Sequence, residues 1–179
     1  MNVYVLRADP DHYKCIIMPE GDFSAFVRRF NGRPIKQKKI QERISVDPGS
    51  YSFPTGDFPS LIPGLPVFSK RAVAALRDIL IGNGDLLSSI IESEEHYVYN
   101  VTRVIDSLDE PNSEVIRFKN SSKVMYIGTH VFFRDKLVGV SIFKIPQDLS
   151  DVYVTDAFVE RVHSAELKGF RFPLVWSSE

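Results

Sequence analysis

The fold is decided by residues 58–84, which read FPSLIPGLPVFSKRAVAALRDILIGNG. Three prolines and a glycine between residues 58 and 69 predict an extended approach that is rich in turns. Ser69 stands where a helix N-cap belongs, because its hydroxyl can accept a hydrogen bond from a free amide of the first turn. We therefore predict a helix over residues 70–80, which the glycines and asparagine at 82–84 end.

The predicted helix has one apolar side. At about 100° per residue, its apolar residues share one arc and its charged residues share the other. The apolar arc consists of Ala72, Val73, Ala75, Leu76, Ile79 and Leu80. The opposite side consists of Lys70, Arg71, Ala74, Arg77 and Asp78. A helix of this kind buries its apolar side, and we expect it to pack on a sheet.

Short β-strands are predicted along much of the remaining chain. Runs rich in β-branched and aromatic residues alternate with turns that contain Gly, Pro, Asn and Asp. The predicted strands are residues 3–6, 13–18, 86–91, 97–104, 115–118, 124–127, 131–133, 140–145 and 170–176. Hairpin turns are predicted at residues 120–122 and 134–136.

Two further helices complete the predicted fold. Asp22 is placed to cap a helix over residues 23–30. Thr155 is placed to cap another, whose apolar side is formed by Phe158, Val159, Val162 and Ala165. Strands and helices do not alternate regularly, which argues against a doubly wound sheet. The sequence predicts a single α+β domain over residues 1–179, a mostly antiparallel sheet of short strands with a few packed helices.

Composition is typical of an ordinary globular protein. The chain has 179 residues, 44% of them hydrophobic, and a formal net charge of −1, so net charge favours no class of partner. Its single cysteine, Cys15, excludes an internal disulfide framework and suits a reducing compartment. The first ten residues lack the features of a signal peptide, and no stretch approaches the roughly 18 apolar residues of a membrane span. We expect a cytoplasmic protein with no membrane partner.

Charge is distributed unevenly along the chain. Residues 28–43 hold seven basic side chains and one acid, Glu42, a balance of +6, so the other residues together carry −7. The basic side chains are Arg28, Arg29, Arg33, Lys36, Lys38, Lys39 and Arg43. Such a segment can meet phosphate, but its low aromatic content gives little support for stacking on single strands. A solvated helix end and loop is the favoured interpretation.

The sequence has no motif that would define an enzyme. It contains no glycine-rich phosphate loop, no paired-histidine zinc helix and no nucleophile turn of the G-x-S-x-G type. The four histidines, His12, His96, His130 and His163, are scattered. His12 and Cys15 have a spacing that can ligate a metal, but without a second pair we predict neither a metal nor a cofactor. The pattern favours a binding protein over an enzyme.

Six short segments, together with Tyr4-Val5-Leu6, carry a family resemblance. They are GDFPSL (56–61), PVFSKRAV (66–73), YVYNVT (97–102), IFKI (142–145), VTDAFVER (154–161) and GFRF (169–172). In this order they resemble a large bacterial family that was first described as a domain of unknown function and later assigned as immunity proteins of polymorphic toxin systems. The resemblance places a family-like core at residues 56–176. It leaves residues 1–55 as a variable N-terminal part that contains the basic segment.

The resemblance implies a protein that binds a cognate toxin and so protects the cell that produces both, alongside a contact-dependent or type VI secreted effector. It brings no catalytic residues, and it directs attention to loops and to the unmatched region. Two alternatives from other classes stay open. One is a small hydrolase-like enzyme, which a concave cluster of histidines and carboxylates would favour. The other is a nucleic-acid-associated protein that uses residues 28–43.

Two acidic connections are the predicted partner-binding residues. Glu92, Glu94 and Glu95 lie in the turn before predicted strand 97–104, and Asp106, Asp109 and Glu110 follow that strand. Acidic loops can steer a basic toxin into contact and speed its association. Because the two groups leave opposite ends of one strand, they can be too far apart to act as one patch. The alternative is a solvated acidic surface that keeps the protein soluble.

Overall fold

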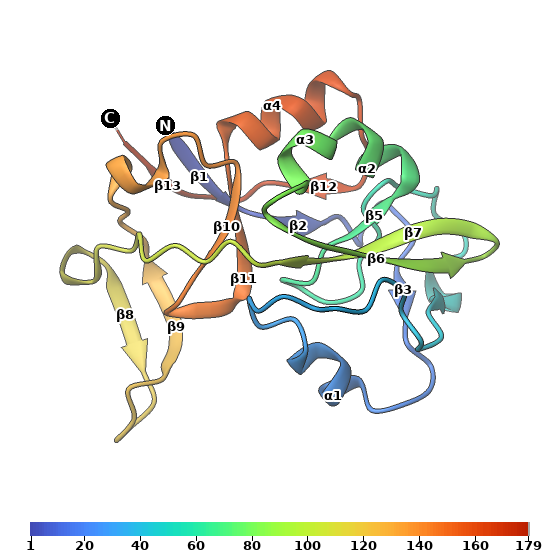
Figure 1. Ribbon diagram of the computed structural model, residues 1–179, viewed down its shortest axis with the longest axis horizontal. Coiled ribbons are helices and arrows are strands. Elements are labelled where there is room, and N and C mark those ends of the chain that lie inside the picture. Colours follow the sequence, from blue (N-terminus) through green and yellow to red (C-terminus); the bar gives the residue numbers. More distant parts are fainter. Residues whose placement is uncertain (179) are drawn as a thin grey trace.

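The structure, a computed structural model, describes residues 1–178 and is built mainly from two antiparallel sheets (Figure 1). The helices are α1 (Phe23–Arg28), α2 (Lys70–Ala75), α3 (Arg77–Leu80) and α4 (Asp156–Ser164), with 3-10 helices η1 (Pro48–Ser50), η2 (Glu110–Asn112) and η3 (Arg134–Leu137). The strands are β1 (Asn2–Val5), β2 (Arg7–Ala8), β3 (Ile16–Ile17), β4 (Ser45–Val46), β5 (Val67–Ser69), β6 (Gly84–Ile91), β7 (Glu94–Val101), β8 (Glu114–Arg117), β9 (Val124–Thr129), β10 (Ile142–Ile145), β11 (Asp148–Thr155), β12 (Phe170–Arg171) and β13 (Leu174–Ser177). Every pair of these strands is antiparallel, so the predicted α+β class is confirmed.

The first sheet has the strand order β10-β11-β1-β13 and is buried on both faces. Val3 on β1 lies opposite Thr155 on β11 and Trp176 on β13. Successive side chains of a strand point to opposite faces. On β11, Val152 and Val154 accordingly pack with α4, while Tyr153 packs with Val3 in a separate cluster on the other face.

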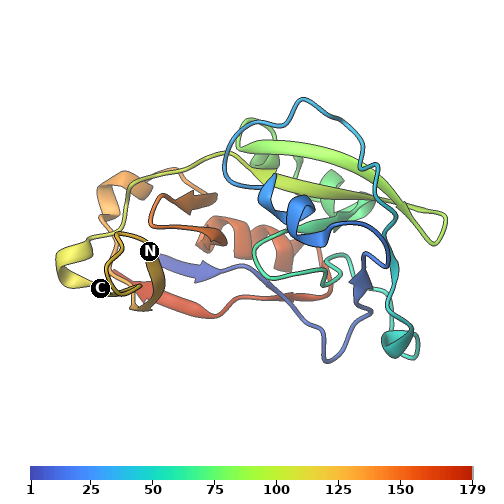
Figure 2. The same ribbon diagram turned by 90° about the horizontal axis from the view of Figure 1, so that it is seen from below.

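The second sheet has the order β5-β7-β6 and is likewise packed on both faces. Tyr99 on β7 joins the large core cluster that includes the apolar sides of α2, α3 and α4. Val98, the residue before it, packs on the other face with Phe26 of α1. The helices α2, α3 and α4 therefore cover one side of both sheets, while α1 covers the opposite face of the second sheet (Figures 1 and 2).

The helix predicted over residues 70–80 is present as two short helices that meet at Leu76. The N-cap prediction is confirmed, because Ser69 Oγ accepts a hydrogen bond from the Ala72 amide at 3.1 Å. Leu76 has φ −100° and ψ 8°, and its carbonyl accepts from the Ile79 amide in a tighter, 3-10-type turn. The predicted end is confirmed at Gly82, whose φ of +85° is the left-handed conformation that glycine favours.

Residues 131–136 differ from the prediction of a strand and a hairpin turn. The Asp109 amide donates to the Val131 carbonyl, and the Phe133 amide donates to the Ser107 carbonyl, so this stretch pairs with the chain around Leu108. The segment at 134–137 then forms η3, which buries Leu137 completely. The predicted turn is wrong because burial of an apolar side chain in η3 takes the place of a two-stranded hairpin.

Three smaller predictions also need correction. Thr155 does not cap α4 with its side chain, because its hydroxyl donates to the Val140 carbonyl in the core at 2.7 Å. The strand predicted at 170–176 is divided into β12 and β13, with Pro173, which has no backbone N–H, between them. The strand predicted at 13–18 is reduced to β3. By contrast Asp22 caps α1 as predicted, by accepting from the Ala25 amide at 2.9 Å.

Candidate partner-binding surfaces

Asp57 joins two of the segments that carry the family resemblance, 56–61 and 66–73, to the residue just before a third, 169–172. Its side chain is buried, and its carboxylate accepts hydrogen bonds from Ser69 Oγ at 2.8 Å and from Arg71 Nη1 at 3.0 Å. The backbone amide of Lys168 donates to the same carboxylate at 2.9 Å. These contacts fix the loop before β5, the start of α2 and the chain after α4 to one another. The motif around Asp57 therefore has a structural role and leaves no free carboxylate for a partner.

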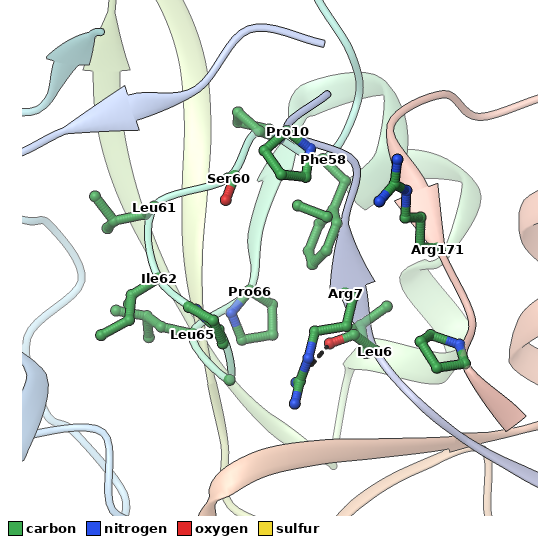
Figure 3. Close-up of a pocket in the computed structure, with 15 residues that line it drawn as sticks. Leu6, Arg7, Pro10, Phe58, Ser60, Leu61, Ile62, Leu65, Pro66 and Arg171 are labelled. Atoms are coloured by element: carbon green, nitrogen blue, oxygen red, sulfur yellow. Dashed lines mark hydrogen bonds between the residues drawn. The ribbon is translucent and has the colours of Figure 1, made fainter. Parts of the chain in front are cut away.

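A cavity of about 280 Å³ lies behind the proline-rich loop that follows Asp57 (Figure 3). Its two arginines are already engaged, Arg7 with Asp151 at 2.8 Å and Arg171 with Asp9 at 2.6 Å. The rest of its lining is largely apolar, as the proline, leucine and phenylalanine side chains in Figure 3 show. This cavity can accept an apolar side chain, but it presents no pair of groups for acid–base chemistry.

The first predicted acidic group lies at the tip of the β6–β7 hairpin. Glu92 is in the two-residue turn, with φ 47°, whereas Glu94 and Glu95 already belong to β7, which corrects their predicted place in the turn. Glu92 pairs with Lys14 at 3.5 Å, and Glu95 pairs with Lys70 at 3.1 Å. Hydrogen bonds from the Tyr97 hydroxyl and from Lys70 lower the pKa of Glu95. Two of these three carboxylates thus already have a basic partner within the protein.

The second predicted acidic group lies around η2. The Gln147 side-chain amide donates to Asp106 at 2.9 Å and to Glu110 at 3.0 Å. Glu110 also pairs with Arg117, and these two partners together hold its pKa below the usual value. Asp109 accepts from the Asn112 side chain at 2.8 Å. Each carboxylate of this group therefore already accepts a hydrogen bond from another side chain of the protein.

The structure does not bring the two acidic groups together. The tip of the β6–β7 hairpin projects at one end of the molecule, and the η2 region lies at the other end in both views (Figures 1 and 2). A single patch made of all six residues is therefore ruled out by the arrangement of the elements. A contact between either group alone and a toxin stays a prediction.

The histidines lie in separate parts of the chain, and two of them line cavities together with carboxylates. His130 borders a cavity of about 280 Å³ together with Asp148, Ser150 and Asp151. Its Nε2 lies 3.1 Å from the Tyr153 hydroxyl. Burial lowers the pKa of His130 and raises the pKa of Asp151. His96 lines a second cavity, of about 190 Å³, together with Glu92 and Glu94, so the hydrolase alternative finds histidine and carboxylates on a concave surface in two places among the described residues.

The groups in the His130 cavity are bonded to other partners and do not form a catalytic set. The Ser150 hydroxyl is hydrogen-bonded to Asp148, and Asp151 is held by Arg7. A nucleophile needs a hydrogen bond to its base, and the base needs a third group to orient it. Within residues 1–178 no hydrogen bond joins Ser150 to His130, and none joins His96 to a side-chain hydroxyl, so neither cavity supports the hydrolase alternative.

The β8–β9 hairpin is an exposed surface that the sequence analysis did not single out. The two strands pair only with each other among the described residues, and they project from the body of the molecule (Figure 1). Phe118, Met125 and Tyr126 are each about half exposed on it, at 50%, 51% and 53%. Their signal in the sequence is the same alternation that predicted strands, which does not distinguish a solvent-facing residue from a core residue.

The described residues were also compared with what a metal site and a membrane-spanning helix would require. Within residues 1–178 no three His, Cys, Asp or Glu side chains gather as they would around a metal ion. His12 instead contacts Asp9 at 3.0 Å. Cys15 is half-buried, and burial raises the pKa of its thiol. No helix of the described residues has the length and apolar character needed to span a membrane.

Comparison with protein families defines the class of the chain. A model of an immunity protein family matches residues 86–175, from β6 to β13, which is half of the chain. The chain belongs to the Immunity protein family (Imm11). The resemblance of the later segments, from 97–102 to 169–172, falls inside the match, whereas 56–61 and 66–73 lie outside it. Comparison with individual curated sequences gives no significant match.

Proposed function

We propose that this protein binds a cognate bacterial toxin and neutralises it, and so protects the cell that produces both. The toxin is a secreted effector of a polymorphic toxin system, for example one delivered by type VI secretion, and the complex forms in the cytoplasm. The observation that carries this proposal is the match of the immunity protein family to residues 86–175.

To neutralise a toxin by binding it, a protein needs an accessible surface and a rigid scaffold. It needs neither a catalytic group nor a cofactor. A standard protein–protein interface covers about 800 Å² on each partner. The protein exposes 9561 Å², so a toxin can be held on a small part of it. Both sheets are packed on both faces, which gives a rigid scaffold on which surface loops can be presented in fixed positions.

Co-expression in a bacterial host tests the proposal. The toxin domain encoded by the gene next to this one is induced alone, with this protein, or with an unrelated immunity protein as the matched control. We expect growth arrest in the first and third cultures and normal growth in the second. Arrest in all three cultures, with toxin and protein both present on an immunoblot, would contradict the proposed function.

A further inference from the structure

The basic segment predicted from the sequence forms one continuous stretch in which most residues are exposed. It runs from the end of α1, passes the β6–β7 hairpin and returns toward β4, as Figure 2 shows for the blue chain that follows α1. Six of its seven basic side chains are exposed. We call these six the basic face: Arg28, Arg33, Lys36, Lys38, Lys39 and Arg43.

Two buried side chains hold the backbone at the start of this stretch. Lys144, which is 2% exposed, donates to the Phe30 carbonyl at 3.2 Å. Asn100, which is 1% exposed, donates to the Arg33 carbonyl at 2.8 Å. A buried donor of this kind is costly to leave without its acceptor, so both contacts fix the path of the chain.

The second sheet fixes residues 35–40 of the stretch. Asp85 accepts from the Ile35 amide at 2.8 Å. The Ser88 amide donates to the Lys38 carbonyl, and the Ile40 amide donates to the Ser88 carbonyl, both at 2.9 Å. The stretch thus covers the outer edge of β6 and is attached to it through backbone atoms, while its basic side chains remain outside.

The charge of the basic face is not neutralised by the protein itself. Arg29, the one basic residue of the segment outside the face, pairs with Glu42 at 2.7 Å. Among the described residues, no carboxylate lies within ion-pair distance of the other six. The nearby acids are occupied, since Asp22 caps α1 and Asp85 holds Ile35. Six like charges on a fixed backbone repel one another, which an acidic partner would relieve.

We infer that the basic face is a toxin-binding surface and that it receives an acidic surface of the toxin. The inference rests on the proposed function and adds to it the chemistry of the partner. A protein partner is favoured over a single-stranded nucleic acid, because Phe30, the one aromatic residue of the segment, is buried and offers no base a stacking platform. Complementary charge then speeds the encounter and fixes the orientation of the complex.

Association rates measured by surface plasmon resonance with the neighbouring toxin domain test this inference. The double variant Lys38→Glu/Lys39→Glu reverses two charges whose side chains make no hydrogen bond among the described residues, so it should fold normally. We expect its association rate at low salt to fall by about tenfold or more, because steering contributes roughly 10–1000-fold to such rates. Its rate should also depend less on salt than that of the wild type.

The matched control is Lys119→Glu/Lys123→Glu, which makes the same charge change on the exposed β8–β9 hairpin. The two variants are compared at physiological salt, where long-range charge alone has a weak effect. There the association rate of the control should stay within about threefold of the wild type, while that of Lys38→Glu/Lys39→Glu should stay clearly slower. If the wild type binds the toxin, an equal fall in association rate for the two variants, or no fall for either, would overturn the inference. Failure of the wild type to bind would instead refute the proposed function.

A 20-base-pair DNA duplex, injected in the same experiment, tests whether the basic face binds a nucleic acid instead of a protein. We expect no binding of the duplex by the wild type at 150 mM salt. Binding to the duplex that Lys38→Glu/Lys39→Glu abolishes, together with unchanged binding to the toxin, would overturn the inference in favour of a nucleic acid.

Discussion

At the scale of single residues, Lys144 is the most unusual side chain of the protein. It lies in β10, where all four residues are buried, and it donates hydrogen bonds to the carbonyls of Phe30 and Leu149. Burial lowers its pKa to about 8 from the ordinary value of 10.5, although Asp148 and Asp151 oppose this shift. The protein thus keeps a costly buried amine at the point where it holds the start of the basic segment.

Replacement of Lys144 by methionine should change how stability depends on pH. Between pH 8 and 10.5 the unfolded chain binds a proton at Lys144 and the folded chain does not, so the stability of the wild type rises with pH in this window. Below the folded pKa both states are protonated and this contribution is absent. From pH 7.5 to 10, we expect the wild type to gain about 2–3 kcal/mol relative to Lys144→Met. Urea denaturation curves at both pH values measure the difference, and parallel changes in the two proteins would disprove it.

Asp57 should be the carboxylate on which stability depends most. Asp57→Ala removes the acceptor of Ser69, Arg71 and the Lys168 amide at once, and leaves that amide without a partner. We expect a loss of about 2–4 kcal/mol, given the cost of losing hydrogen bonds to a charged, buried acceptor. The control is Asp135→Ala in η3, an exposed position where a change of about 0.5 kcal/mol or less is expected. Similar denaturation midpoints for the two variants would show that Asp57 does not hold these parts of the chain together.

At the scale of elements, the α2–α3 unit shows how burial is shared between two short helices. α2 has six residues and α3 has four, lengths at which an isolated helix is not stable in water. Their stability comes from the side chains that they bury, of which Ala72, Leu76 and Leu80 are completely inaccessible. Leu76 stands at the break itself, so its packing holds both helices in place.

Leu76→Ala should therefore cost about 2–5 kcal/mol, the range for truncating a buried leucine. Arg77→Ala, one residue later on the exposed side, is the control and should change stability by about 0.5 kcal/mol or less. Guanidinium denaturation followed by circular dichroism measures both. A loss below about 0.5 kcal/mol for Leu76→Ala would mean that this face is not packed as described.

The elements that follow from local rules were predictable, and those that depend on distant contacts were not. The caps at Asp22 and Ser69 and the hairpin turn near Asn120 need only neighbouring residues, so the sequence predicted them. Thr155 has the composition of a cap, but its hydroxyl is used by the Val140 carbonyl 15 residues away. The two acidic groups were found as sequence clusters, but their internal partners Lys14, Lys70 and Gln147 come from elsewhere in the chain. Such pairing is invisible until the chain is folded.

At the scale of the whole molecule, the acidic groups and the basic face would bind toxin surfaces of opposite charge. The acidic groups would meet a basic toxin, but five of their six carboxylates already have partners within the protein. In the basic face only Arg28 has a side-chain partner among the described residues, the Ser24 hydroxyl at 3.3 Å, so more of its charge is available to a second protein. The charge of the toxin surface is therefore the property that distinguishes the two.

Charge reversal at the hairpin tip tests the acidic alternative separately. In Glu92→Lys/Glu94→Lys/Glu95→Lys we expect an association rate with the neighbouring toxin domain within about twofold of the wild type, or faster, because an acidic toxin gains attraction from the change. Replacement of Asp106, Asp109 and Glu110 by lysine should likewise leave the association rate within about twofold of the wild type, or raise it. A slower, less salt-dependent association for either variant would identify that group as part of the interface with a basic toxin.

We propose that this protein neutralises its toxin by forming a complex with it. The most direct measurement is a titration of the purified toxin domain with the purified protein, followed by the activity of the toxin. We predict that activity falls in proportion to the protein added and reaches its minimum at a fixed molar ratio, independently of incubation time. Loss of activity that continues with time at a small fraction of that ratio would contradict the claim, because it would show that the protein acts on the toxin as an enzyme.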